Sequence, residues 1–208
     1  MRGMVITSVI GVWLSPVIAV AEAQRAVEEP VLLEFVRDYA ATAGLSELKT
    51  AKLKPGASEI RIWTGFGVIS PDHAVVISVV PGQPVKGRAL NRFSYDPDDS
   101  EDMRELLSEC ASAPQYREDM VICDAKLARP VDWEALYKRI DRLGITVLPD
   151  ESSLPPTEHR VHDGAAILVE IAAPDGYRAY SYSNPMFRSE PEAQAALGIM
   201  RAVNNVFN

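Results

Sequence analysis

A predicted β-hairpin between residues 165 and 184 constrains the fold more than any other part of the chain. The run AAILVEIAAPDGYRAYSYSN holds two strand-like segments joined by Pro174-Asp175-Gly176, and these three residue types favour tight turns. A loop with an even number of residues would place the following side chains on one face: Ile167, Val169, Ile171, Tyr180 and Tyr182. Glu170 would then point to the opposite face with Ala179 and Ser181, whereas an odd loop would bring Glu170 beside the tyrosines.

Three earlier segments are predicted to be strands, at residues 59–69, 74–80 and 87–96. Alternation in the first segment separates Arg61 and Trp63 from the side chains of the other face, which are Ile60, Ile62, Thr64, Phe66 and Val68. The turn sequences SPDH and PGQP separate the three segments. Because consecutive strands joined by short turns usually pair with each other, we expect an antiparallel meander.

Helical patterns occupy much of the remaining sequence. Four helices are expected: residues 29–43, a segment with Asp99 or Ser100 as its N-cap, residues 130–144, and a C-terminal segment that starts at a capping box of Ser189 and Glu192.

Two more strands are expected at residues 118–127 and 145–149, on either side of the third helix. This order permits a parallel crossover, which would make the sheet mixed. The expected fold is therefore one α+β domain over residues 24–208. Its mainly antiparallel sheet would have about six or seven strands, with about four helices packed on it.

The first 23 residues have the pattern of a secretory signal peptide. Arg2 precedes a largely uncharged apolar run that ends in small residues. That run is short for a membrane-spanning helix, which needs about 20 apolar residues, although an uncleaved N-terminal anchor is the alternative. We predict cleavage after Ala21 or Ala23, export to the periplasm or the medium of a bacterium, and no stable membrane insertion of the mature chain.

Charge and motifs exclude several classes of function. The net charge of -8 disfavours nucleic acids and anionic membranes as partners, because both are polyanions. No phosphate-binding loop, dinucleotide fingerprint or zinc-protease motif is present, so no cofactor is predicted. Asp96, Asp98 and Ser100 resemble the start of a calcium loop, but Glu101 replaces its glycine and Leu107 its bidentate glutamate, so no metal is predicted there either.

The only two cysteines, Cys110 and Cys123, are predicted to form a disulfide. An exported chain meets an oxidising compartment, and an even number of cysteines suits pairing there. The bridge would pin the segment between the second long helix and the strand that follows. A reactive thiol is the alternative, but neither cysteine has a local activating environment in the sequence.

The stretch EHRVHDG contains the most enzyme-like residues, His159, His162 and Asp163. Two histidines at a spacing of three lie on opposite faces of a strand, and a zinc site usually needs three or four ligands. We therefore predict a turn that leads into the hairpin, and no metal site. If the protein were an exported hydrolase, its site would be sought at these three residues, with Glu170 next.

A second cluster points to recognition. Arg178, Tyr180 and Tyr182 lie within twelve residues rich in tyrosine and arginine, which are common in binding hot spots, and Arg61 and Trp63 share the less apolar face of their strand. These five residues are the predicted binding residues. The alternative is that the tyrosines face the core and that a helix covers Trp63.

Three functions stay open from the sequence. The leading hypothesis is a small exported protein of the bacterial envelope that acts by binding a partner, such as another envelope protein, and that could inhibit an enzyme or toxin. The hydrolase described above is the first alternative. A structural or accessory envelope component without a discrete site is the second.

Overall fold

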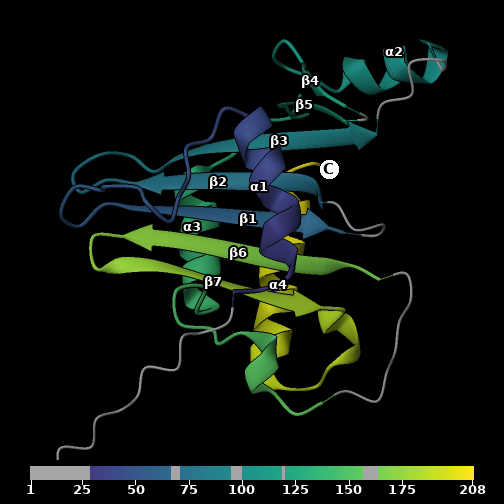
Figure 1. Ribbon diagram of the computed structural model, residues 1–208. Coiled ribbons are helices and arrows are strands. Elements are labelled where there is room, and N and C mark those ends of the chain that lie inside the picture. Colours follow the sequence, from purple (N-terminus) through teal and green to yellow (C-terminus); the bar gives the residue numbers. More distant parts are fainter. Residues whose placement is uncertain (1–28, 67–70, 95–99, 119, 157–163) are drawn as a thin grey trace, which may run out of the picture.

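A single seven-stranded sheet organises the chain in the computed structural model, which describes residues 29–66, 71–94, 100–118, 120–156 and 164–208 (Figure 1). The strands are β1 (Ser58–Gly65), β2 (Pro71–Val79), β3 (Lys86–Ser94), β4 (Gln115–Arg117), β5 (Met120–Asp124), β6 (Ala166–Ala173) and β7 (Gly176–Ser183). They lie in the order β4-β5-β3-β2-β1-β6-β7, and every neighbouring pair is antiparallel. The expected α+β fold is confirmed.

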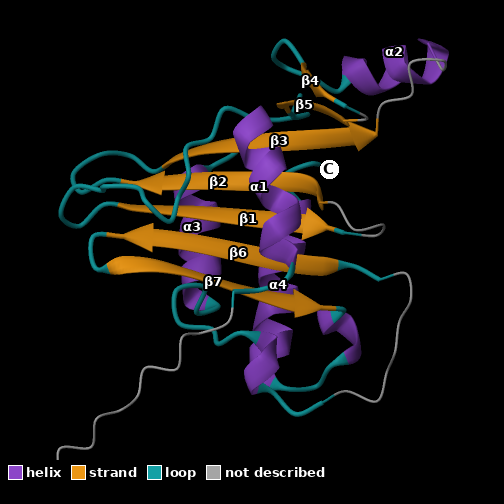
Figure 2. Ribbon diagram, in the orientation of Figure 1, coloured by secondary structure: helices purple, strands orange, loops and turns teal. Residues whose placement is uncertain are grey.

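The helices cover the two faces of this sheet unequally. They are α1 (Leu32–Thr42), α2 (Ser100–Ser108), α3 (Trp133–Arg142) and α4 (Pro191–Asn204), with two short 3-10 helices, η1 (Glu151–Ser153) and η2 (Pro185–Phe187). Helix α1 crosses one face, whereas α3 and α4 lie on the other (Figure 2). Each face has its own apolar core, and the core beneath α3 and α4 is the larger.

The hairpin of β6 and β7 forms as the sequence predicts. Ala173 pairs with Gly176, so Pro174 and Asp175 make a two-residue loop. The apolar face of the hairpin packs in the core beneath α3 and α4 through Ile167, Val169, Ile171, Tyr180 and Tyr182. Glu170 pairs with Ala179 and points to the face that α1 covers.

The alternation predicted for β1 is confirmed as far as Thr64 and is wrong beyond it. Ile62 enters the core beneath α3 and α4, and Trp63 enters the core beneath α1. The pairing with β2 then shifts register between Thr64 and Gly65, where Gly65 and Phe66 have φ angles of 108° and 63°. This bulge turns Phe66 to the α1 face, opposite to its predicted side.

Residues 145–149 do not form the expected strand, so the parallel crossover that the sequence order permits is not formed and the sheet is entirely antiparallel. The chain turns immediately after α3, and the amides of Val147 and Leu148 both donate to the carbonyl of Gly144. Ile145 and Leu148 are buried while Val147 is exposed, which is the spacing of a turn and not of a strand. The seventh strand is the three-residue β4, which pairs with β5.

The segment after α3 protects the outer edge of β7 without pairing as a strand. Tyrosine hydroxyl groups of β7 donate to backbone carbonyls of this segment, and backbone amides of β7 donate to carboxylates of this segment. These contacts are Tyr180 to Ile145 (2.8 Å), Tyr182 to Pro149 (2.8 Å), Ser181 to Asp150 (2.9 Å) and Ser183 to Glu151 (2.8 Å). Because an edge strand with free amides invites pairing with another chain, these contacts close the sheet on this side.

Helices α3 and α4 begin in different ways. The Asp132 carboxylate accepts from the amide of Ala135 at 2.9 Å and caps α3. The capping box predicted from Ser189 is wrong, because Glu190 is the N-cap of α4 and no side chain caps that helix. The Glu190 carboxylate instead lies 2.9 Å from the guanidinium of Arg188.

The predicted disulfide between Cys110 and Cys123 is present. Cys110 lies two residues after the end of α2, and Cys123 lies in β5. Their Cα atoms are 5.6 Å apart. Cys110 also forms an isolated bridge with Ala125, so α2 is tied to the end of the sheet where β4 and β5 lie. The disulfide therefore fixes the least extensively paired end of the sheet.

Several predictions fall on residues outside the described part of the chain. These are the signal peptide, the acids Asp96 and Asp98, and Asp99 as an N-cap. Of the helices that the structure describes, none is long and apolar enough to cross a membrane.

Removing the disulfide tests how far it supports the fold. We expect the double variant Cys110→Ser, Cys123→Ser to lose about 3 kcal/mol of unfolding free energy, because a short closed loop restricts the unfolded chain. Urea denaturation of the wild-type protein, the reduced wild-type protein and the variant would measure this loss of unfolding free energy. A loss within about 0.5 kcal/mol of zero, the range of ordinary surface substitutions, would contradict this account.

The β7 edge gives a prediction that depends on pH. Burial raises the pKa of Glu151, although its hydrogen bonds with Ser183 act in the opposite direction. A folded-state pKa above the unfolded value means that ionisation of Glu151 destabilises the fold as pH rises through that range. We expect Glu151→Gln to raise the melting temperature relative to wild type at pH 7 and to lose this advantage in acid. If the advantage of the variant in melting temperature grew as pH falls, the pKa of Glu151 would be lowered by folding and not raised.

Candidate ligand pocket beneath helix α1

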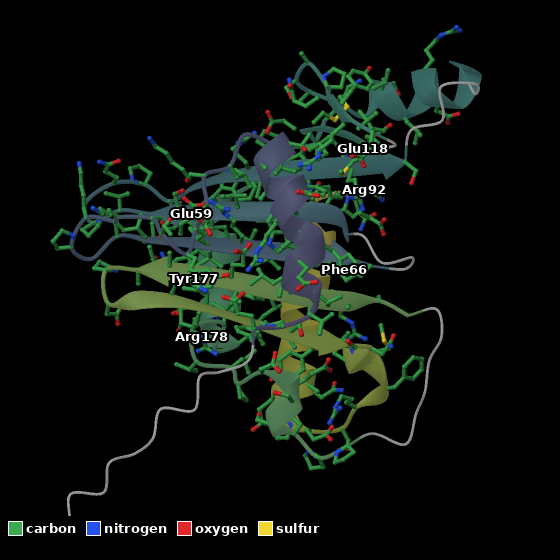
Figure 3. All side chains as sticks on the ribbon, in the orientation of Figure 1. Glu59, Phe66, Arg92, Glu118, Tyr177 and Arg178 are labelled. Carbon is green, nitrogen blue, oxygen red and sulfur yellow. A yellow bond between two sulfur atoms is a disulfide. The ribbon has the colours of Figure 1, made fainter. Side chains whose placement is uncertain are left out.

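A pocket of about 210 Å³ lies between α1, the segment that follows it and the sheet. Its lining, which defines the α1 pocket, consists of Leu33, Val36, Arg37, Ala40, Ala41, Leu45, Ser46, Glu47, Leu48, Lys49, Arg61, Glu170 and Tyr177. Apolar side chains from α1 and from residues 45–48 make most of the wall. Polar side chains of β1, β6 and β7 make the floor, and Figure 3 shows Glu59 and Tyr177 at the same end of the sheet.

Glu170 is the central group of the floor. Its Oε2 accepts a hydrogen bond from Trp63 Nε1 at 2.8 Å, and its Oε1 accepts one from the Tyr177 hydroxyl at 3.0 Å. Glu170 is only 6% exposed. Among the ion pairs of the described residues none includes Glu170, so neutral donors alone hold this carboxylate.

Arg61 lies directly opposite Glu170 in the register of β1 and β6, yet its guanidinium group turns elsewhere. Arg61 Nε and Nη2 donate to Glu59 Oε1 at 2.8 and 2.7 Å, and Nη2 also donates to the carbonyl of Ser46 at 2.7 Å. Arg61 is 2% exposed. The contact with Ser46 therefore ties the segment after α1 to the sheet and closes one side of the pocket.

Exposed charges stand at the rim. The Glu29 carboxylate accepts from Arg37 at 2.7 Å and from Lys49, which connects the residues before α1, α1 itself and the segment after it. The hydrogen bond from Lys49 is the main influence that lowers the pKa of Glu29. Because all three side chains are well exposed, these pairs contribute little stability and can rearrange around a ligand.

Two aromatic contacts fix the floor in place. Burial raises the pKa of Tyr177, and the neighbouring Glu170 carboxylate raises it further, so the phenol stays a hydrogen-bond donor at physiological pH. The ring of Tyr39 packs edge-on against Trp63, with centroids 5.0 Å apart. The indole that donates to Glu170 is therefore held by packing from α1 as well as by its own hydrogen bond.

The predicted binding residues do not gather on one exposed surface. Trp63 is buried beneath α1, and Tyr180 and Tyr182 are buried on the opposite face of the sheet. Arg178 is half-buried, donates to the carbonyls of the segment after α3 and lies over the Tyr180 ring at 5.1 Å. These four serve the core and the β7 edge, and Arg61 is the member of the predicted set that lines the α1 pocket.

Of the predicted catalytic candidates, Glu170 alone lies in the described part of the chain. His159, His162 and Asp163 lie outside the described residues, so a hydrolase site there stays a prediction. His73 is described, and its Nδ1 lies 3.0 Å from Asn91 Oδ1 while its ring stacks on Phe207. Within the described ranges no group of three or more His, Cys, Asp or Glu residues could hold a metal ion.

Sequence reasoning singled out Glu170 but missed its partner Tyr177 and the apolar wall. The signal for Glu170 was its place as the one charged residue in the strand AAILVEIAA. Tyr177 belonged to the tyrosine-rich cluster, and the hairpin register puts it beside Ala172, on the same face as Glu170. No local pattern marks Leu45 and Leu48 as pocket residues, because they lie in an irregular segment.

Comparison of the chain with protein-family models, curated proteins and solved structures finds no match in any of the three. The geometry of the α1 pocket therefore carries the functional argument alone. The pocket presents a carboxylate held by neutral donors to a volume with apolar walls. Such an arrangement suits recognition, since a few placed polar groups in an apolar pocket fix the orientation of a ligand.

Substitution of Arg61 tests whether the floor holds the pocket together. We expect Arg61→Met to lose about 3 kcal/mol of stability, because it leaves Glu59 and the Ser46 carbonyl without their donor. Hydrogen exchange in residues 45–49 should also accelerate. Arg88→Met is the matched control, since Arg88 makes an exposed pair with Asp124 on a neighbouring part of the sheet. Equal effects of the two substitutions would contradict this role for Arg61.

Proposed function

We propose that this chain is an exported protein of the bacterial envelope that acts by binding a ligand group in the α1 pocket. The group belongs to a small molecule or to a protein partner, and inhibition of that partner is one form the activity could take. The observation that carries the proposal is the buried Glu170 carboxylate, which faces the pocket and forms no ion pair with a side chain in the described part of the chain.

Export is supported by two features that are independent of the pocket. The first 23 residues have the order of a signal peptide, with a positive charge, an apolar run and small residues. The disulfide between Cys110 and Cys123 suits an oxidising compartment. An export signal and a disulfide are compatible with many activities, so the pocket is what favours binding over a purely structural role.

Burial of a charged group in a fold is costly unless the group is paired, and a neutral acceptor such as glutamine at position 170 would satisfy Trp63 and Tyr177 without a buried charge. The surrounding positions of β6 are apolar, and its neighbours on the same face, Leu168 and Ala172, are buried apolar side chains. A glutamate at this position is therefore better explained by recognition than by stability.

Intact mass measurement would test the compartment. Protein recovered from the exported fraction should lack its first 21 or 23 residues and should gain about two mass units on reduction, because one disulfide takes up two hydrogens. A full-length protein with free thiols in the cytosol would contradict export.

Binding is tested through the indole N–H of Trp63, which is buried and donates to the pocket residue Glu170. The low-mass and high-mass fractions of the exported contents would each be added to ¹⁵N-labelled protein. We expect at least one fraction to shift the Trp63 indole signal in the wild type and not in Ala41→Trp, where an exposed pocket residue is enlarged to fill the cavity. If neither fraction moves the signal, binding through this pocket is wrong.

A further inference from the structure

We infer that the α1 pocket accepts an aliphatic chain that ends in a primary ammonium group, with the ammonium on Glu170 and the methylene groups against the apolar wall. The inference rests on the proposed binding function and specifies the chemistry of the ligand. Four observations support it: the charge balance of the floor, the free acceptor positions of Glu170, the wall and the volume.

The charged side chains of β1 and β6 beneath the pocket are Glu59, Arg61 and Glu170, which leaves one negative charge in excess. The rim cations Arg37 and Lys49 pair with Glu29. Arg61 is neutralised by Glu59, since two of its guanidinium nitrogens lie within 2.8 Å of one Glu59 oxygen. Glu170 then remains as a buried carboxylate whose donors, Trp63 and Tyr177, are neutral. Because a desolvated charge attracts an opposite charge strongly, a cation is the ligand group that gains most from this position, and a carboxylate would be repelled.

Glu170 also has acceptor capacity to spare. An ionised carboxylate has about four lone-pair positions, and each oxygen of Glu170 accepts one hydrogen bond from the protein. A primary ammonium group brings three donors and no acceptor, so it can bind both oxygens without leaving a buried acceptor of its own unsatisfied. An alcohol brings a single donor and no charge, and it would bind more weakly.

The wall and the volume match a short methylene chain. Leu33, Val36 and Ala40 of α1 and Leu45 and Leu48 of the following segment supply the apolar part of the lining. Long amines place their methylene groups along apolar surface while the charge reaches a polar group, as lysine side chains do. A volume of about 210 Å³ accommodates one such chain, either as a free amine or as the side chain of a lysine in a partner protein.

The experiment follows the Trp63 indole signal, assigned by its loss in Trp63→Phe, during titration with probes of equal length. These are n-butylamine, n-butanol and butyrate, together with N-acetyl-lysine N-methylamide as the lysine of a peptide chain. We expect saturable shifts with both amines and much weaker effects from the alcohol and the acid. Binding of butylamine without the lysine derivative would identify free amines as the source, and tight binding of the lysine derivative would favour a partner protein.

Three variants separate recognition from structure. Glu170→Gln keeps an acceptor for Trp63 but removes the charge, and it should weaken butylamine binding about tenfold or more. Ala41→Trp fills the pocket and leaves the Glu170 carboxylate and its two donors in place, so it should block butylamine binding, and it keeps the test open if Glu170→Gln fails to fold. Glu105→Gln removes an exposed charge on α2 and should change nothing.

The outcomes distinguish this inference from the function on which it rests. If butanol or butyrate binds as well as butylamine, or if Glu170→Gln binds the amine unchanged, the ammonium inference is wrong while the pocket remains a ligand site. If no probe and no fraction of the exported contents moves the Trp63 signal, both the inference and the proposed function fail.

Discussion

The hydrogen bond between the Trp63 indole and the Glu170 carboxylate is the interaction on which the α1 face of the sheet depends. It joins β1 to β6 across two neighbouring strands and lies entirely within the fold. A buried carboxylate requires donors, and Trp63 and Tyr177 supply them from strands on either side of β6. Helix α1 must then cover the indole, which it does through the edge of the Tyr39 ring.

The two faces of the sheet consequently serve different purposes. Beneath α3 and α4 the core is apolar apart from tyrosines whose hydroxyl groups reach the carbonyls of the next segment and Thr64, which donates to Asn204 of α4. On the other face α1 covers a floor that contains Arg61 and Glu170, and the side chains leave a pocket at one end. Stability comes mainly from the first face, and recognition is proposed for the second.

Much of the fold was predictable because its patterns are local. The β6–β7 hairpin has a turn sequence that sets its register, and that register alone places Glu170 on the opposite face of the sheet from Tyr180 and Tyr182. The disulfide followed from having only two cysteines in a chain with an export-like N-terminus. The α+β class and the number of strands were also correct, although residues 145–149 were taken for a strand in place of β4.

The errors arose where tertiary contacts outweigh local pattern. Val147 is β-branched and suits a strand, but the chain must turn after Gly144 to bring carbonyls to the β7 hydroxyls. Phe66 changes face because a bulge at Gly65 interrupts the alternation. Trp63 was among the predicted binding residues. The sequence around it does not indicate that its indole donates a hydrogen bond to Glu170, which lies 107 positions away.

The measurement that tests the central claim most directly is a crystal structure of the protein with n-butylamine bound. The account predicts the amine nitrogen within hydrogen-bonding distance of Glu170, with its carbon chain between Leu33 of α1 and Leu48 of the following segment, and with the Trp63 and Tyr177 hydrogen bonds retained. An amine bound elsewhere, or an α1 pocket filled by the protein's own side chains, would contradict the account.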